Sequence, residues 1–322
     1  MSYRTSVIAA FLSVLLGALY PCRPVTAAES FLDDFFEQRD AGDPVGKVLL
    51  TPEIEKIFVY RPVRSWAGEK FIFHPKPVSL QRFYYPHITL SDKGKGGPGK
   101  AHPSYADCAG RICTLNEITS TGDKAYLAEA VMDDDGTKFT ISMTENFMDG
   151  LIAVKDLENA RKYFLNKKVW YLKENLLSYD PAADEYIPVW AEKGSRLKIV
   201  RIEPSFDNKA PIRIFLDNGF GQTGYIDINL SGTNVPATMM GRNTFFETFS
   251  LEDPSSWSER EKNLIANNMV ASGMSRNQVR KSWGPPLTIQ PGKGGESEKW
   301  VYPYGDVLIF RNGKMAERTK EK

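Results

Sequence analysis

The sequence predicts a mainly β protein that carries a small α+β module at its C-terminal end. Between Lys47 and Asn229, short apolar runs alternate with Pro, Gly, Asp and Asn, a pattern typical of short strands joined by turns. From residue 258 onward, two capped helical segments precede further apolar runs that read as three strands. A length of 322 residues favours two or three domains, at roughly 150 residues each.

The first 28 residues have the pattern of a secretory signal peptide. Arg4 precedes an apolar run from Val7 to Tyr20, whose helical length of about 21 Å is short of a hydrocarbon core of about 30 Å. Small residues follow in Val25-Thr-Ala-Ala28, so we expect cleavage after Ala27 or Ala28, with an uncleaved anchor as the alternative. The mature chain is therefore expected in the periplasm without a transmembrane segment, and outer-membrane association stays open.

Residues 29–59 read as an N-terminal helix and lead-in, because Phe31, Leu32, Phe35 and Phe36 share one helical face. The net charge of the chain is +1, and removal of Arg4 and Arg23 with the signal leaves −1. A chain without an excess of basic residues does not attract the phosphates of nucleic acid, so we exclude nucleic acid as a partner.

Six apolar runs between residues 70 and 229 are expected to be strands. They are Lys70–Phe73, Arg111–Leu115, Lys138–Met143, Lys168–Leu172, Arg196–Ile202 and Tyr225–Asn229.

Two of these stretches resemble each other, which suggests a tandem repeat. Gly110–Ile118 aligns with Gly194–Ile202, and an acidic turn follows each. Each copy, with about five strands and a long first loop, resembles the bacterial SH3-like barrel. That resemblance implies one barrel over 60–160, a second over 161–233 and a linker over 234–257. The low-complexity segment 91–104, rich in Gly and Lys, reads as a loop inserted in the first barrel.

Residues 258–322 carry the strongest local signals. Ser258 and Glu261 have capping-box spacing, and Ser275 and Gln278 repeat it before a second helix. Gly284-Pro-Pro286 stops that helix. Asn312-Gly313 predicts a tight hairpin after the third strand.

In this order, Gly273-Met, Gln278-Val, Gly284-Pro-Pro286, Trp300-Val-Tyr302 and Phe310-Arg-Asn-Gly313 resemble the SmpA/OmlA family of small outer-membrane-assembly lipoproteins, also called BamE-like. The resemblance covers about 258–318 and implies an ααβββ domain that contacts proteins. We expect this chain to differ from the family in having no lipid anchor, and it places the module behind a larger region.

The mature chain would keep two cysteines, Cys108 and Cys113, because Cys22 leaves with the signal. In an oxidising compartment, such a close lone pair most simply forms a structural disulfide. Four intervening residues are too many for the usual redox motif. A zinc site that recruited His102 and Asp107 would have unusual spacing.

No catalytic residue, metal site or cofactor is predicted, and the chain is more consistent with a binding protein than with an enzyme. One alternative is a cell-wall hydrolase of the Cys-His type, which would use Cys113 with one of three histidines, His74, His87 or His102. Another is a calcium-dependent adhesive module around Asp133-Asp-Asp-Gly136, although acidic turns are commoner as plain hairpins.

Aromatic residues in or beside the expected second barrel are the candidate partner-binding residues, because SH3-like grooves bind extended chains. They are Tyr171, Tyr179, Tyr186, Trp190 and Tyr225. The sequence thus predicts a non-enzymatic binding or scaffold protein of the cell envelope. Its partner would be an envelope protein or peptidoglycan, and its oligomeric state is left open.

Overall fold

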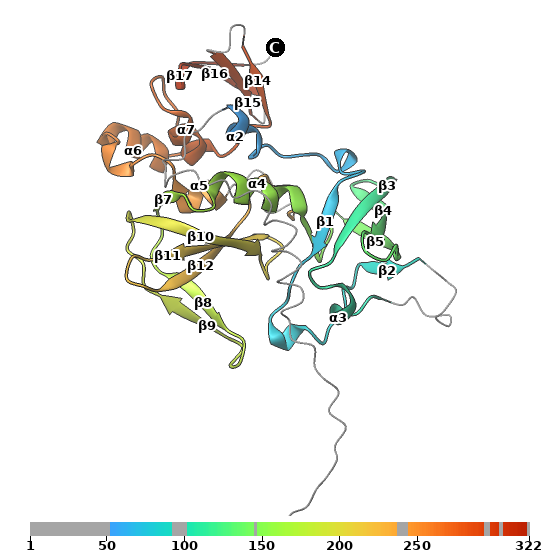
Figure 1. The fold of residues 1–322 in the computed structure, drawn as a ribbon. Helices are drawn as coiled ribbons and strands as arrows, with labels where there is room; N and C mark the ends of the chain where they lie inside the picture. The colour runs from blue at the N-terminus through green and yellow to red at the C-terminus, as the bar shows by residue number, and fades with distance from the viewer. Residues whose placement is uncertain are drawn as a thin grey trace, which may run out of the picture. The chain divides into compact units, whose positions relative to one another are not determined.

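The computed structural model describes residues 52–91, 102–144, 147–236, 244–292, 297–302 and 305–320. The fold is mainly β, as predicted: three antiparallel sheets are joined by short helices (Figure 1). The predictions of a signal peptide over 1–28 and a helix over 29–40 lie outside the described residues, as does most of the Gly/Lys-rich loop 91–104.

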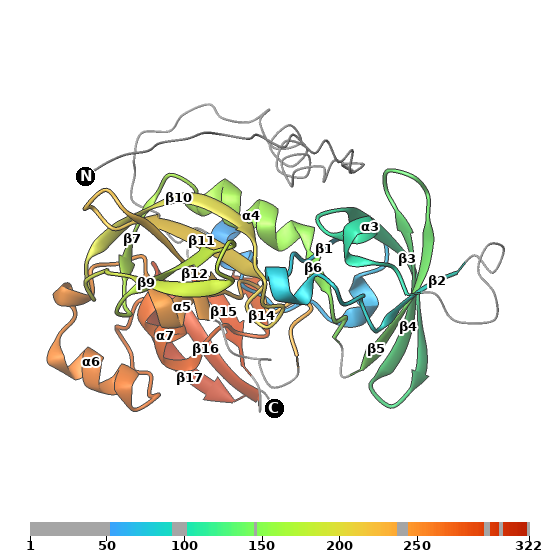
Figure 2. The same cartoon turned by 90° about the horizontal axis from the view of Figure 1, so that it is seen from below.

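The first sheet has six strands, and Figure 2 shows its central strands β3, β4 and β5 side by side. In sheet order the strands are β2 (Ile88–Leu90), β5 (Lys138–Thr144), β4 (Ala125–Met132), β3 (Ile112–Gly122), β1 (Lys70–Phe73) and β6 (Leu151–Ala153). Three short helices belong to the same part of the chain, namely η2 (Val63–Ser65), η3 (Val78–Leu80) and α3 (Tyr105–Cys108).

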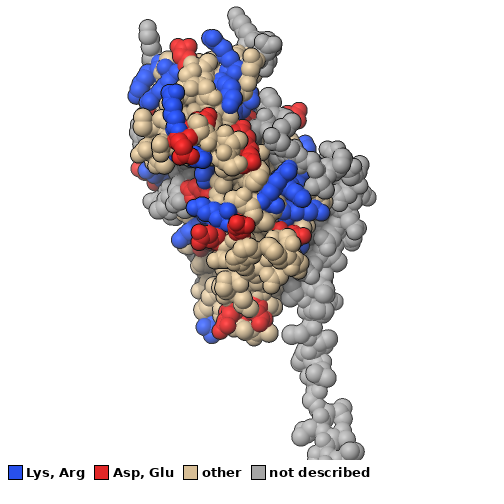
Figure 3. Space-filling view, turned by 90° about the vertical axis from the view of Figure 1, so that its left-hand side faces the viewer, with Lys and Arg blue, Asp and Glu red and all other residues tan. Residues whose placement is uncertain are grey.

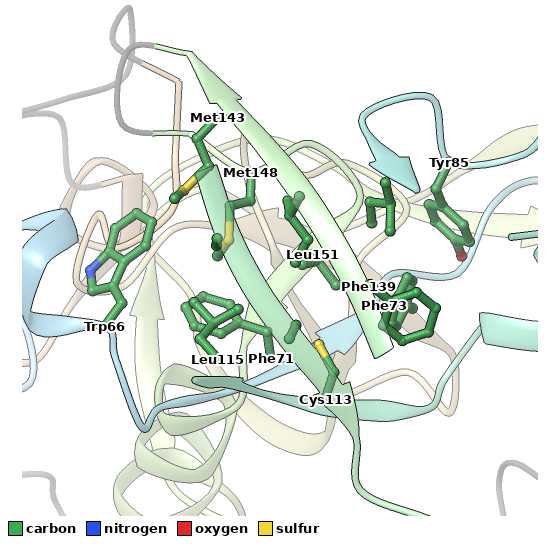
Figure 4. Close-up of a cluster of buried hydrophobic side chains, with 14 of the residues drawn as sticks. Trp66, Phe71, Phe73, Tyr85, Cys113, Leu115, Phe139, Met143, Met148 and Leu151 are labelled. Carbon is green, nitrogen blue, oxygen red and sulfur yellow. The ribbon is translucent and has the colours of Figure 1, made fainter. Parts of the chain in front are cut away.

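Large apolar side chains fill the core of this first sheet. Phe71 and Phe73 alternate along β1, and Trp66 is fully buried beside Phe71, with ring centroids 5.8 Å apart. The indole Nε1 of Trp66 donates to the carbonyl of Arg61 at 2.9 Å, so the buried ring keeps its polar group satisfied. Figure 4 shows Cys113 pointing into the same cluster.

The second sheet has seven strands. In sheet order they are β13 (Phe249–Ser250), β7 (Lys168–Tyr171), β10 (Arg196–Pro204), β11 (Ile212–Asp217), β12 (Thr223–Ile228), β8 (Leu176–Asp180) and β9 (Glu185–Val189). Helix α4 (Val154–Phe164) precedes β7 and lies along β10 in both ribbon views. Val154, Leu157, Ala160 and Phe164 recur every three or four residues on its buried side.

The two sheets share one strand order. In each, the first strand (β1 or β7) lies beside the first strand of a three-stranded meander, β3–β4–β5 or β10–β11–β12. The long connection after the first strand carries an extra strand, β2 or β8, that pairs with the end of the meander. A last short strand, β6 or β13, pairs back onto the first. Only the second sheet extends further, through β9 at its edge.

Gly224 lets the β8–β9 hairpin lie against β12. A Cβ at this position would sit 2.6 Å from the Cβ of Leu176 and 3.0 Å from the Cβ of Val189. We expect Gly224→Ala to lower the free energy of unfolding by about 1–3 kcal/mol through overpacking, measured by urea denaturation. Gly122→Ala is the matched control, because its nearest neighbour would be 3.9 Å away. Equal effects of the two substitutions would contradict the close approach.

The stretch 234–257, expected to be a linker, is built into the fold wherever it is described. Residues 244–250 form α5 (Thr244–Thr248) and β13, and β13 pairs with β7. Phe245, Phe246 and Phe249 are all buried. The barrel resemblance implies a linker here, but three phenylalanines in five residues carry too much apolar surface to remain in water.

The C-terminal part contains α6 (Glu259–Ala266), α7 (Arg276–Trp283) and a four-stranded sheet. Both predicted capping boxes are present, Ser258 with Glu261 and Ser275 with Gln278. The strands, in sheet order, are β14 (Thr288–Pro291), β15 (Ser297–Val301), β16 (Asp306–Arg311) and β17 (Lys314–Lys320). The sheet therefore has four strands where three were expected before the hairpin, and β17 follows that hairpin at Asn312, where φ is 49°.

Candidate functional site

The five predicted partner-binding aromatics divide into two groups. Tyr171 and Tyr225 are buried, with 0% and 2% of their surface exposed, so neither can face a partner. Tyr171 donates to the carbonyl of Asn175 and fixes the turn after β7. For these two residues the predicted ligand-facing role is corrected to a role in the core.

The other aromatics lie on or beside the β8–β9 hairpin. Tyr186 and Trp190 are half exposed, at 50% and 53%, and Tyr179 is partly buried at the hairpin end. Further apolar side chains are exposed on both faces of the same hairpin and in the turn before β12. We call the resulting set the hairpin surface: Leu177, Tyr186, Ile187, Trp190 and Phe220.

A chain of ring contacts holds the hairpin surface in place. Arg213 is buried. Its Nε donates to Asp227 Oδ1 at 2.8 Å, and its Nη2 donates to Asp227 Oδ2 at 2.9 Å. Its guanidinium lies 3.8 Å from the ring centre of Tyr225 and 4.2 Å from that of Phe206. Phe206 in turn meets Tyr179 edge-on, with centroids 5.1 Å apart. The stack orders the exposed hairpin, because each ring is fixed by the one beneath it.

The phenol of Tyr225 has a special position in this stack. Its Oη is buried and has no hydrogen-bond partner within the described part of the chain. Burial raises the pKa of Tyr225 to about 12, against the charge of Arg213, which lowers it. The phenol is therefore neutral at physiological pH, and the Tyr225 ring contributes a cation–π contact with the guanidinium of Arg213.

A second exposed apolar segment contacts the hairpin from the connection between β1 and β2. We call it the 78–84 segment, and its exposed side chains are Val78, Leu80, Phe83 and Tyr84. The backbone N–H of Val78 donates to Tyr179 Oη at 2.9 Å, and that of Ser79 donates to Asp184 Oδ2 at 3.3 Å. Tyr179 Oη also donates to Asp184, which joins the two segments in one network.

The connection after β1 and the connection after β7 thus meet at Tyr179 and Asp184. Apolar side chains are exposed on both sides of this contact. Figure 3 shows a broad area without Lys, Arg, Asp or Glu in the lower part of the described surface, at the height of β8, β9, β11 and β12 in Figure 1. Exposed apolar surface of this kind, rimmed by charge, commonly marks an interaction site. Sequence reasoning missed the 78–84 segment because a Pro-rich loop gives no periodicity from which exposure can be judged.

The cysteines do not form the predicted disulfide in the structure: Cys108 and Cys113 are both free and buried. Cys108 ends α3, and Cys113 lies on β3 in the core of the first sheet. Burial raises the pKa of Cys108 to about 12 and raises that of Cys113 further. A thiol that stays protonated is a poor nucleophile, so the geometry does not favour a Cys-His hydrolase.

None of the three histidines is hydrogen-bonded to a cysteine within the described residues. His102 Nδ1 lies 2.7 Å from the carbonyl of Ile88, and its ring stacks on Tyr84. His87 lies 3.9 Å from Asp149 at the surface. His74 is buried, and its backbone carbonyl accepts a hydrogen bond from Tyr85 Oη.

His74 should make stability depend on pH. Burial, together with the charge of Lys76, lowers the pKa of His74 from 6.5 to about 4. In the unfolded chain, His74 therefore takes up a proton below pH 6.5. In the folded protein, it stays neutral until the pH falls to about 4. Stability is then full above pH 6.5 and falls by about 3 kcal/mol as the pH drops to 4.

Urea denaturation of the wild type and of His74→Phe from pH 7 to pH 4 tests this pH dependence. The difference between the two proteins isolates His74 from Asp156, whose pKa burial raises to about 6 and which acts in the opposite direction over this range. A difference that does not change with pH would contradict a neutral buried His74.

Each carboxylate of the acidic turn Asp133–Gly136 is paired with a basic side chain of the same chain. Arg111 pairs with Asp134 and Asp135, and Lys70 pairs with Asp133 at 2.6 Å. These contacts hold the pKa of Asp135 at about 2, chiefly through its hydrogen bonds to Thr137 and Arg111. The carboxylates thus form ion pairs that stabilise the turn. Within the described ranges, no group of three His, Cys, Asp or Glu side chains could hold a metal ion.

Comparison with protein-family models, curated proteins and solved structures found no match to this chain. Among the helices of the described residues, none combines the length and the apolar character needed to cross a membrane.

Proposed function

We propose that this chain is an exported, non-enzymatic binding or scaffold protein of the cell envelope, which binds its partner through the hairpin surface and the 78–84 segment. The observation that carries the proposal is the meeting of two exposed apolar segments, distant in sequence, at Tyr179 and Asp184. Periplasmic location follows from the signal pattern in residues 1–28 and is part of the proposal.

We further propose that the first two sheets are tandem SH3-like barrels. The shared strand order supports this, as does the placement of β2 and of the β8–β9 hairpin in the long first connections. In such barrels the first long loop borders the ligand groove, and extended chains bind there. The partner is accordingly an extended envelope protein segment or a peptidoglycan peptide.

The partner class is tested by sedimenting the mature protein with purified sacculi and, separately, with outer-membrane extracts. Retention by sacculi identifies peptidoglycan, and retention by extracts alone identifies an envelope protein. Retention by neither would contradict the binding proposal.

The hairpin surface should carry the binding energy. We expect the double substitution Trp190→Ala and Phe220→Ala to weaken retention by about 10- to 100-fold, because large exposed aromatics are typical hot spots. Their rings contact each other, with centroids 5.1 Å apart and 53% and 71% of the residues exposed. The free energy of unfolding should change by less than about 0.5 kcal/mol, as is usual for surface positions.

The matched control for this double variant is Met269→Ala with Leu287→Ala. Both residues are exposed apolar side chains of the C-terminal part, outside the hairpin surface. Equal loss of retention by the two double variants would show that binding does not depend on the hairpin.

For the C-terminal part, we propose a BamE-like module that contacts protein. The order of its motifs and its two capped helices support this. A truncation at Ser256 is a poor test, because it would remove the arginine that pairs with the buried carboxylate of Glu55.

A further inference from the structure

The segment from Pro52 to Phe58 packs into the C-terminal part of the chain, about 220 residues away in sequence. It forms the short helix α2 (Pro52–Lys56) and one further turn. Ile54, Ile57 and Phe58 are buried, and Phe58 meets the ring of Phe246 with centroids 4.6 Å apart. The segment therefore inserts side chains into the fold rather than lying on its surface.

A buried carboxylate fixes this segment to α7. Glu55 is fully buried, and its Oε2 accepts a hydrogen bond from Arg280 Nε at 2.7 Å and a second from Arg280 Nη2. Arg280 Nη2 also donates to the backbone carbonyl of Glu55 at 3.3 Å. Because the guanidinium of Arg280 binds both the carboxylate and the backbone carbonyl of Glu55, it fixes the position of the backbone as well as pairing with the charge.

Aromatic rings surround the guanidinium. Arg280 lies 4.6 Å from the ring centre of Trp300, 5.1 Å from that of Phe58 and 5.4 Å from that of Phe246. Phe58, three residues after Glu55, thus supplies one ring of the cage, and the C-terminal part and α5 supply the others. The Glu-x-x-Phe spacing places both side chains on one face of a helical turn.

A second arginine completes the pocket. Arg276 lies 3.9 Å from Glu55 Oε1 and is held by Glu298 through bonds of 3.0 and 2.8 Å. Glu298 is in turn oriented by Trp300 Nε1 at 3.1 Å. Arg276, Glu298 and Trp300 are thus held together by contacts within α7 and β15 that do not require α2, whereas Arg280 donates its hydrogen bonds to Glu55 itself.

Some buried polar atoms at the contact between Glu55 and Arg280 have no hydrogen-bond partner among the described residues. Within the described residues, Glu55 Oε1 and Arg280 Nη1 are buried without a hydrogen-bond partner. Buried polar atoms are normally satisfied, and each one left unpaired is unfavourable. The pocket therefore has a donor, Arg280 Nη1, that its present occupant does not use.

We propose that the pocket of Arg276, Arg280, Phe246 and Trp300 is a binding site for acidic-apolar peptide segments of Glu-x-x-Phe pattern, that Glu55–Phe58 is its intramolecular ligand, and that an external segment of this pattern displaces it. Residues 59–69 link the internal ligand covalently to the fold, so displacement needs a competing segment at high local concentration. This site is independent of the hairpin surface.

Cutting the chain beside the ligand tests the proposal on the whole protein. A protease recognition sequence is inserted between Val59 and Tyr60, and the purified protein is cleaved, which leaves the upstream fragment bound only through non-covalent contacts. The probe is a synthetic peptide of residues 51–60, and its controls carry Glu55→Gln or Phe58→Ala. Gel filtration measures how much fragment stays bound at each peptide concentration.

We expect the fragment to stay bound after cleavage and to be released by excess peptide. Release by the Glu55→Gln peptide should need about 100-fold more peptide, because it leaves the arginines without their carboxylate. Loss of the fragment on cleavage without binding of the peptide would overturn the proposal. Equal release by the probe and both control peptides, or no release by any of them, would also overturn it.

A second measurement covers the case in which the cleaved protein unfolds. In the uncut Phe58→Ala protein, the internal ligand is weakened while Glu55 and Arg280 are kept. The labelled peptide should bind this variant at least about 10-fold more tightly than wild type. Leu287→Ala, at an exposed position of the same part, should leave peptide binding as in wild type. Equal binding by Phe58→Ala and wild type would overturn the proposal.

Discussion

Replacing Arg280 by methionine is expected to lower the free energy of unfolding by about 3–5 kcal/mol, because Glu55 would remain as a buried charge without its partner. Both side chains have none of their surface exposed. Burial already raises the pKa of Glu55 above its ordinary value, and the charge and hydrogen bond of Arg280 oppose that rise. Without Arg280, Glu55 must take up a proton or open the site to water.

The double substitution Glu55→Leu with Arg280→Met is the informative control. It removes both charges and fills the site with apolar atoms, and we expect it to recover most of the stability lost in Arg280→Met. Urea denaturation of the wild type, the two single variants and the double variant at pH 7 gives the coupling energy of the pair. A single variant that loses less than about 1 kcal/mol would contradict a dry, paired site.

Local signals explain why much of the fold could be predicted. The runs from Lys70, Lys138, Lys168 and Arg196 are strands because apolar and β-branched residues alternate there between turn residues. The capping box at Ser275 depends on residues three apart in sequence, so it needs no knowledge of the rest of the fold. Signals of this range survive in any tertiary context.

The candidate site was predicted only in part, because alternation shows which residues share a face but not which face is covered. Tyr225 and Asp227 lie on the same face of β12, yet Tyr225 is buried under Arg213 while Asp227 is half buried. The exposure of Phe220 depends on a turn geometry that the sequence leaves open. A Gly-Phe-Gly turn between two strands is nevertheless a usable signal, since such a ring has few neighbours to pack on.

Contacts between distant segments could not be predicted from one sequence. Glu55 and Arg280 each look like ordinary surface charges of a short helix, and only the fold shows that they meet in the core. Likewise, Asn234 is the first residue of the stretch 234–257 that was expected to be a linker. In the structure it joins this stretch to the first sheet.

Asn234→Ala is the second substitution with a large expected effect. Asn234 Oδ1 accepts the N–H of Met148 at 2.6 Å, and its Nδ2 donates to the carbonyls of Met148 at 3.1 Å and Leu151 at 2.6 Å. All three residues are buried, so the alanine variant leaves backbone groups unpaired in the core. We expect the free energy of unfolding to fall by about 3 kcal/mol or more.

Part of that loss comes from the backbone, because Asn234 has a φ of 54°, a conformation that alanine adopts only with strain. Asn312→Ala measures this part alone: Asn312 has a φ of 49° and is exposed, and we expect a loss of about 1 kcal/mol. Asn234→Gly removes the side chain without the strain and should still lose about 2 kcal/mol. If Asn234→Gly were as stable as wild type, the three hydrogen bonds would contribute nothing, and the stretch after β12 would be a linker after all.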